Sequence, residues 1–148
     1  MLATTLITLF KRDLNRLKTE IESYQNPSNI WATQQGIANS AGNLCLHLVG
    51  NLNTYIGANL GQSGYIRNRE LEFSLKDVPV QELIKKIVDT IVMVESTLKG
   101  ISDTQLEAEY PFLVMEEMTT TQFFLIHLCS HLSYHLGQIN YHRRLLDK

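Results

Sequence analysis

Histidines crowd toward the end of the chain, where four of the five lie between residues 127 and 142. They are His127, His131, His135 and His142. At about 100° per residue, a helix would place all four on one face, with Gln138 among them. Neighbours four residues apart on that face lie close enough for two imidazoles to bind one metal ion. The spacing therefore indicates a metal site built on one adjacent pair, with a further ligand from another helix.

The fifth histidine supplies a candidate for that further ligand. His47 lies in a second amphipathic segment, with Asn51 and Tyr55 following at four-residue steps on the same face. If the two segments are neighbours, His47 completes a set of three imidazoles. Such a set with an open fourth position is typical of a catalytic Zn²⁺ site, and Ni²⁺ or Fe²⁺ would also accept it. Asn51 and Tyr55 are then candidates to orient a water or substrate, or else only satisfy each other.

A second interpretation of the histidines needs no metal. A histidine on an amphipathic helix often packs its ring and satisfies its nitrogens with a backbone or side-chain partner. Two histidines four residues apart also arise often by chance. Both interpretations stay open at the level of residue spacing.

Four amphipathic segments must position these side chains. Apolar residues recur at three- and four-residue steps over about 3–24, 40–60, 79–100 and 121–146, which predicts four long helices and an all-α four-helix bundle. The stretch 61–78 breaks the pattern and reads as a long connection, of a length that is often functional. Ser102 to Gln105 resembles a capping box that opens a short helix. Residues 107–115 could hold a short strand.

Composition excludes several classes of protein. Thirteen Lys and Arg against fifteen Asp and Glu give a net charge of -2, so we expect no nucleic-acid partner. No apolar run reaches membrane-spanning length, and the first residues do not form a signal peptide, so we expect no membrane partner. The two cysteines, Cys45 and Cys129, are expected to be reduced thiols of a cytoplasmic protein. The length predicts a single domain over residues 1–148.

Three segments of the chain carry a resemblance to a known family. LCLHLVGNLNTYIG, RNRELEF and HLCSHLSYHLGQI together resemble the DinB-like superfamily of small bacterial proteins, also called DinB/YfiT-like metalloenzymes, over essentially the whole chain. The resemblance implies a mirror variant of the up-and-down four-helix bundle, commonly a homodimer. It also implies a divalent metal, Zn²⁺ or Ni²⁺, held by His47, His131 and His135. His127 would then pack near the ligands rather than bind the ion.

The same resemblance suggests a class of reaction. Characterised branches resemble transferases that use bacillithiol, mycothiol or glutathione, and a mycothiol-dependent maleylpyruvate isomerase. A bound ion would stabilise the thiolate of such a low-molecular-weight thiol. Leu136 stands where many relatives carry a basic residue, which weakens any transfer of substrate binding to this chain.

Three functional hypotheses follow. The first is a metal-dependent enzyme acting on a small-molecule substrate or thiol. The second is a dimeric bundle that binds a metal or ligand without catalysis, and the third is a scaffold whose metal site is empty. Gln138 is a candidate to support a metal ligand. Arg67 and Arg69, in the 61–78 connection, could bind a substrate carboxylate, although an ion pair with Glu70 explains them equally well.

Overall fold

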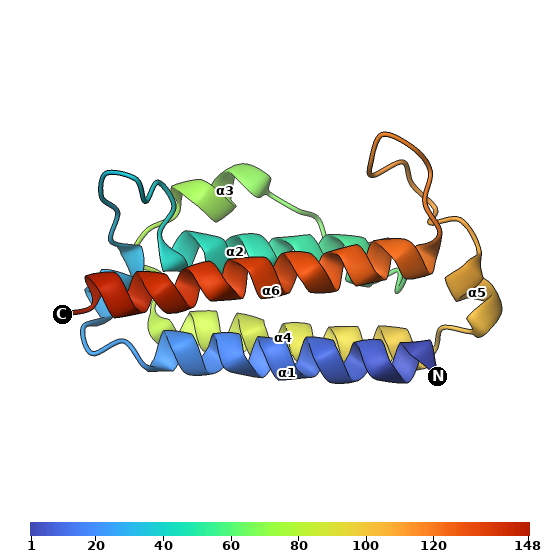
Figure 1. The fold of residues 1–148 in the computed structure, drawn as a ribbon, viewed down its shortest axis with the longest axis horizontal. Helices are drawn as coiled ribbons and strands as arrows, with labels where there is room; N and C mark the ends of the chain where they lie inside the picture. The colour runs from blue at the N-terminus through green and yellow to red at the C-terminus, as the bar shows by residue number, and fades with distance from the viewer.

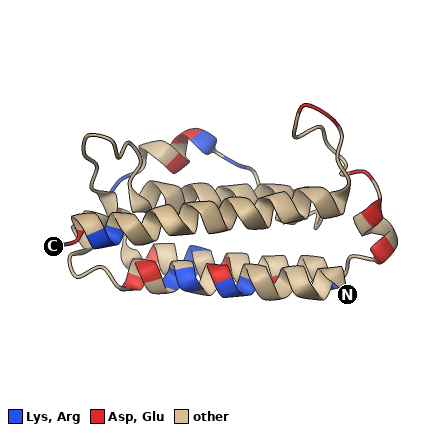
Figure 2. Ribbon diagram, viewed as in Figure 1, with Lys and Arg blue, Asp and Glu red and all other residues tan.

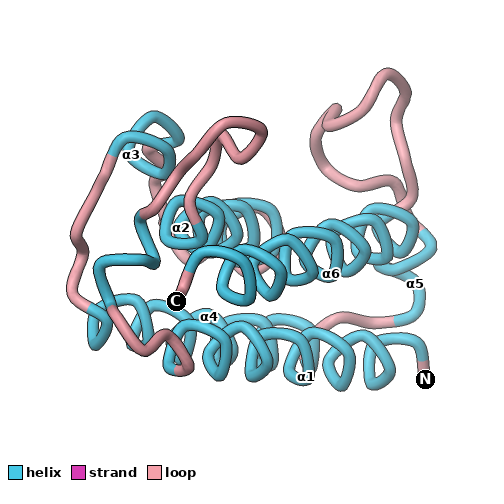
Figure 3. Tube along the Cα trace, turned by 60° about the vertical axis from the view of Figure 1, so that its left-hand side comes forward, coloured by secondary structure: helices cyan, strands magenta, loops and turns pink.

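Helices make up all the regular structure in the computed structural model, which describes residues 1–148. The four long ones are α1 (Leu2–Glu22), α2 (Ala41–Leu52), α4 (Val80–Lys99) and α6 (Thr121–Leu146). They lie side by side along the long axis of the molecule (Figure 1). The trace in Figure 3 contains helices and loops and no strand. The all-α prediction is therefore confirmed.

The long helices pack as two layers. α2 and α6 contact each other in one layer, and α1 and α4 contact each other in the second (Figure 1). Between the layers lies one continuous cluster of buried apolar side chains, because each helix repeats such residues at three- and four-residue steps. Phe10, Leu14, Leu48 and Leu132 are among its fully enclosed members. This core sets the spacing between α2 and α6, the two helices that carry the histidines of interest.

Charge is distributed unequally between the layers. Figure 2 shows Lys, Arg, Asp and Glu on α1, on α4 and on the short helices, whereas α2 and most of α6 carry none. Arg143 and Arg144, in the last turn of α6, are the only charged residues of these two helices. No helix in the structure combines the length and the apolar character needed to cross a membrane.

The second helix differs from its predicted extent of 40–60. The α-helix ends at Leu52 and continues as a π-helical turn, η2 (Asn53–Ala58). The side-chain amide of Asn53 donates to the Val49 carbonyl and to Thr90 Oγ1 on α4. The first residue of the π-turn therefore bonds to the neighbouring helix. A π-turn is a local widening of the helix that hydrophobic periodicity does not reveal.

The connections contain three short helices. η1 (Pro27–Trp31) is a 3₁₀ helix, and α5 (Asp103–Glu107) begins with the predicted capping box, in which Ser102 and Gln105 bond reciprocally. The third, α3 (Arg69–Ser74), lies inside the stretch 61–78 that was predicted to be a loop. Asn68 caps it by accepting from the Leu71 amide, but six residues are too few to show a helical period. The possible strand at 107–115 is wrong, since only a single bridge joins Glu109 to Thr120.

Two glycines within helices give a matched test of this packing. A Cβ atom at Gly42 would lie 2.6 Å from the ring of Trp31, whereas one at Gly137 would meet nothing within 4 Å. We expect Gly42→Ala to lower the free energy of unfolding by about 1–3 kcal/mol through overpacking. Gly137→Ala should leave it unchanged or raise it by up to about 1 kcal/mol, because alanine favours helix. Chemical denaturation followed by fluorescence of Trp31, the only tryptophan, measures both.

Equal destabilisation by the two substitutions would contradict the placement of Trp31 against the first turn of α2.

Candidate metal centre

Three histidines meet between α2 and α6, although 84 positions separate the first two in the sequence. His47 Nε2 lies 3.3 Å from His131 Nε2, and His135 Nε2 lies 3.1 Å from the same atom. One nitrogen from each ring lies within 4.8 Å of the other two. The structure therefore brings together the three histidines of the predicted set, close enough to hold one metal ion.

The rings are arranged so that their edges converge. His131 and His135 lie at 89° to each other with centroids 4.5 Å apart, and His47 lies at 88° to His135. Four-residue spacing on α6 gives the first pair, and the contact between α2 and α6 adds the third ring. Ligands about 2.1 Å from a tetrahedral Zn²⁺ ion would be about 3.4 Å apart, near the two short separations observed.

Hydrogen bonds to the outer nitrogens determine where two of the rings carry their protons. Glu72 Oε1 lies 3.0 Å from His47 Nδ1, and Gln138 Oε1 lies 2.7 Å from His135 Nδ1. Both oxygens are acceptors, so each Nδ1 carries the proton and donates it. The Nε2 atoms of His47 and His135 are then left with lone pairs that point toward His131.

His131 lies at the centre of the cluster and has no other polar contact. Its Nδ1 atom is buried without a hydrogen-bond partner. Burial, followed by the neighbouring His135 and His47, lowers the pKa of His131 to about 4. Burial also lowers the pKa of His47, despite the opposing effect of Glu72. Both rings are neutral at pH 7, which is the form that binds metal ions.

Glu72 is the site residue that the sequence analysis missed. Its buried carboxylate accepts from Arg67 Nε at 2.7 Å and Nη2 at 2.9 Å, as well as from His47. The carboxylate rests against Gly50, where any Cβ atom would collide with Glu72 Oε2. The sequence offered one signal for this contact, namely Gly50, which lies one turn beyond His47. Glycine weakens a helix, so its presence there indicates that another group approaches the backbone closely.

The two arginines of the connection differ in their contacts within the chain. Arg67 pairs with Glu72, rather than with the predicted Glu70, and its guanidinium lies 5.9 Å from the centre of the Tyr55 ring. Arg69 lies over the ring of Phe73 at 5.7 Å, and that ring packs against His47. Both side chains therefore support the ring of His47. Arg67 is thus paired within the chain, whereas Arg69 is exposed and has no hydrogen-bond or ion-pair partner, so it stays a candidate to bind a substrate carboxylate.

The two polar residues that follow His47 do not satisfy each other. Asn51 is buried, and its Oδ1 atom has no hydrogen-bond partner. The ring of Tyr55 instead packs edge-to-face on Phe124, with centroids 5.2 Å apart. Asn51 therefore places a buried acceptor without a donor one turn from His47 on the same helix.

The remaining histidines lie outside the cluster. His127 is exposed and stacks on Phe124, with 14° between the ring planes. His142 is buried, where its Nδ1 accepts from the Tyr24 hydroxyl and its Nε2 donates to the Ala32 carbonyl. The interpretation without metal thus describes His142, whose two nitrogens are both satisfied.

The cysteines take no part in the site. Both are free, and Cys45 is fully buried in the core. Burial raises the pKa of its thiol to about 12, and burial likewise raises the pKa of Cys129. Neither thiol is ionised at pH 7, so neither is a nucleophile there, and neither belongs to the histidine cluster.

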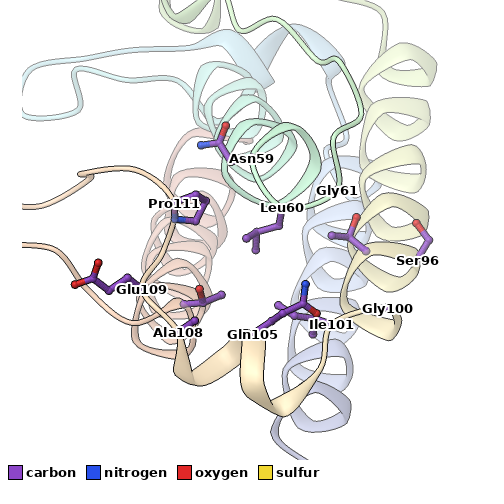
Figure 4. A pocket seen from close by; sticks show the side chains of 12 residues that line it. Asn59, Leu60, Gly61, Ser96, Gly100, Ile101, Gln105, Ala108, Glu109 and Pro111 are labelled. Atoms are coloured by element: carbon purple, nitrogen blue, oxygen red, sulfur yellow. The ribbon is translucent and has the colours of Figure 1, made fainter.

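A cavity of about 540 Å³ lies at the far end of the helices, between η2, α4 and α5. Asn59, Ser96, Gln105 and Glu109 are among its lining residues (Figure 4). It contains no histidine or cysteine and only one carboxylate. The cavity therefore lacks a cluster of metal ligands and a histidine that could activate its hydroxyl groups, and the histidine cluster is the candidate functional site.

Comparison with protein families gives one finding. A family model described as "Protein of unknown function (DUF1572)" matches residues 3–148. No curated protein matches the chain. Neither comparison supplies an activity for the chain.

The depressed pKa of His131 predicts how the stability of the metal-free protein depends on pH. The unfolded chain binds a proton at His131 near pH 6.5, whereas the folded protein resists it until about pH 4. The free energy of unfolding should therefore fall as the pH drops through that window, by on the order of 1–2 kcal/mol once the partial exposure of the ring is allowed for. Urea denaturation between pH 7 and pH 4 measures it.

His131→Asn is the control, since it removes the titrating ring and should flatten the curve in this window. A wild-type curve no steeper than that of the variant would contradict the assignment.

Proposed function

We propose that this chain, which belongs to the family of proteins of unknown function DUF1572, binds a divalent metal ion through His47, His131 and His135. One observation carries the proposal, namely that three Nε2 atoms face one another without enough protons to pair them. The Nε2 atoms of His47 and His135 carry lone pairs and no proton, because Glu72 and Gln138 accept the protons that these rings carry at Nδ1. His131 can donate to one of its neighbours but not to both. A cation satisfies all three at once.

The donor set favours Zn²⁺ or Ni²⁺ as the ion. Neutral imidazoles suit both, and the two short nitrogen separations agree with a tetrahedral site. Glu72 and Gln138 would act as the outer partners that fix the orientation of two ligands and increase their basicity. The pair of Arg67 with Glu72 limits that increase, because the carboxylate is shared between a cation and His47.

We further propose that the ion serves catalysis. Only these three His, Cys, Asp or Glu side chains converge here, so the protein leaves a fourth coordination position open. A divalent ion with an open position lowers the pKa of a thiol or water that binds to it. The imidazoles would hold the ion, while the uncharged surroundings on α2 and α6 strengthen its field.

The reaction class that we propose is transfer to or from a low-molecular-weight thiol, in keeping with the resemblance to the DinB-like superfamily. The all-helical structure with two layers of long helices supports a DinB-like four-helix bundle. Exposed apolar side chains in the first half of α6, Phe123 and Ile126, support a homodimer through that part of the helix.

The alternative, a metal ion with a purely structural role, has less support. Structural zinc sites usually fill all four positions with protein ligands. His127, the nearest further histidine on α6, is exposed and stacked on Phe124. Glu116 and Glu117 are exposed in the connection before α6 and are not part of the histidine cluster. A noncatalytic ligand-binding bundle would still hold the ion, and thiol turnover distinguishes it from an enzyme.

Metal content tests the proposal directly. We expect untagged protein, purified without chelator, to contain close to one equivalent of Zn²⁺ or Ni²⁺ per chain, and His131→Ala to contain almost none, because His131 is the central ligand. Elemental analysis of both proteins measures this.

His127→Ala is the matched control, because it removes an exposed histidine from the same helix and should leave the metal content unchanged. Equal metal content in wild type and His131→Ala, or none in the wild type even after reconstitution, would contradict the site.

Glu72 gives a second test of the same site. Glu72→Gln removes the charge that supports His47, so we expect the affinity for Zn²⁺ to fall by about 10- to 100-fold. Competition with a chromophoric chelator measures the affinity, and circular dichroism checks that the fold is retained.

Glu70→Gln is the control, since Glu70 lies exposed on the same short helix. An affinity that falls equally in both variants would assign the effect to α3 as a whole and not to the contact between Glu72 and His47.

A further inference from the structure

We propose that a half-open cavity beside His135 binds the uncharged apolar part of the substrate while the substrate's polar end reaches the metal ion. The inference rests on the proposed function, because the ion supplies the reacting end of the site. The cavity measures about 690 Å³ and lies between the second half of α6 and the connection at residues 36–39. His135 is common to the cavity and to the histidine cluster.

The shape of the cavity suits a small molecule. Its volume falls within the range of about 300–1,000 Å³ that small-molecule sites occupy. One wall is a tight turn in which Gln34 and Ile37 exchange two backbone hydrogen bonds. Gly36 completes that turn with φ of 82°, a left-handed conformation that glycine adopts without strain. The opposite wall is the continuous helix α6, so both walls are fixed by backbone hydrogen bonds.

The lining indicates the chemistry of the ligand. Its lining includes the apolar and aromatic side chains of Ile37, Leu44, Tyr134, Tyr141 and Leu145. The cavity has no Lys, Arg, Asp or Glu to balance a charge. Its two histidines are already engaged, His142 with Tyr24 and Ala32, and His135 with Gln138. The amide nitrogen of Gln138 has no partner in the protein and can donate to a carbonyl or ether oxygen. The ligand is therefore a neutral molecule with an aromatic or aliphatic body.

Gly137 provides an independent reason to expect a close neighbour here. It lies within α6, where glycine costs about 1 kcal/mol relative to alanine, and it lines the cavity. A Cβ atom at this position would meet nothing within 4 Å, so packing within the chain does not require glycine. A ligand that approaches the helix backbone at this point would require it.

Two probes that differ in their apolar part test the cavity. Acetohydroxamic acid and benzohydroxamic acid are neutral at pH 7 and bind metal ions through the same group, but one carries a methyl and the other a phenyl group. We expect the Zn²⁺-loaded protein to bind the phenyl probe about tenfold more tightly, because its ring becomes buried. Calorimetry gives the two affinities, and amide NMR shifts at residues 36–39 and 134–145 report where the ring binds.

Variants separate the cavity from the metal. Gly137→Leu places a side chain in the open space at the cavity edge, and Tyr141→Ala removes part of a wall. Both should bring the ratio of the two affinities close to one while leaving the zinc content unchanged. Phe123→Ala is the matched control, since it removes another exposed aromatic ring of α6 outside the cavity and should keep the tenfold ratio.

The outcomes distinguish this inference from the proposed function. A protein that holds zinc but binds both probes equally overturns the cavity and leaves the metal site standing. A protein without zinc overturns the metal site, while NMR shifts caused by the phenyl probe at the cavity residues would still support the cavity. If Gly137→Leu changes only the oligomeric state in sedimentation, the cavity belongs to an interface between two copies and the inference is wrong.

Discussion

The convergence of three imidazole nitrogens between two helices is the constraint on which the rest of the site depends. Nitrogens about 3 Å apart must share protons or a cation, and acceptors on the outer edges of two rings keep those protons away from the meeting point. Burial makes protonation of His131 costly, since its pKa falls to about 4. His47 and His131 are therefore neutral donors at pH 7, and the geometry of the three rings suits a metal ion.

The layer of α2 and α6, which holds the histidine cluster, carries few charged side chains. α2 carries no charged residue, and α6 carries them only in its last turn, whereas α1 and α4 carry many (Figure 2). The one carboxylate near the histidines, Glu72, enters from α3 and is neutralised by Arg67. Burying a carboxylate without that partner would destabilise the fold, because the charge would lose its hydration without compensation. The pair with Arg67 offsets this loss and lets Glu72 support His47 within an apolar layer.

The position of the short helix α3 against α2 is what brings Glu72 to His47. Asn43, in the first turn of α2, donates to the carbonyl oxygens of Glu72 and Leu75, which ties α3 to the surface of α2. Gly50 then leaves the space that the Glu72 carboxylate occupies. On the opposite side of the cluster, Gln138 holds His135 at the edge of the cavity between α6 and the 36–39 connection. Glu72 and the cavity thus lie on different sides of the same three rings.

The sequence by itself determined the helical class and the four long amphipathic helices, because helical period is a local property of the chain. Four-residue spacing left open which pair of histidines could bind an ion, and the resemblance to the DinB-like superfamily selected His47, His131 and His135. The sequence also determined the capping box at Ser102, which depends on residues three apart. Only the tertiary structure decided that Glu72 rather than Glu70 pairs with Arg67, that α3 exists, and that His142 belongs to a separate buried network. Long-range contacts decide these features, because Asn43 and His47 of α2 hold α3 and Glu72 in place, and Tyr24 and Ala32 hold His142. No local pattern encodes such contacts.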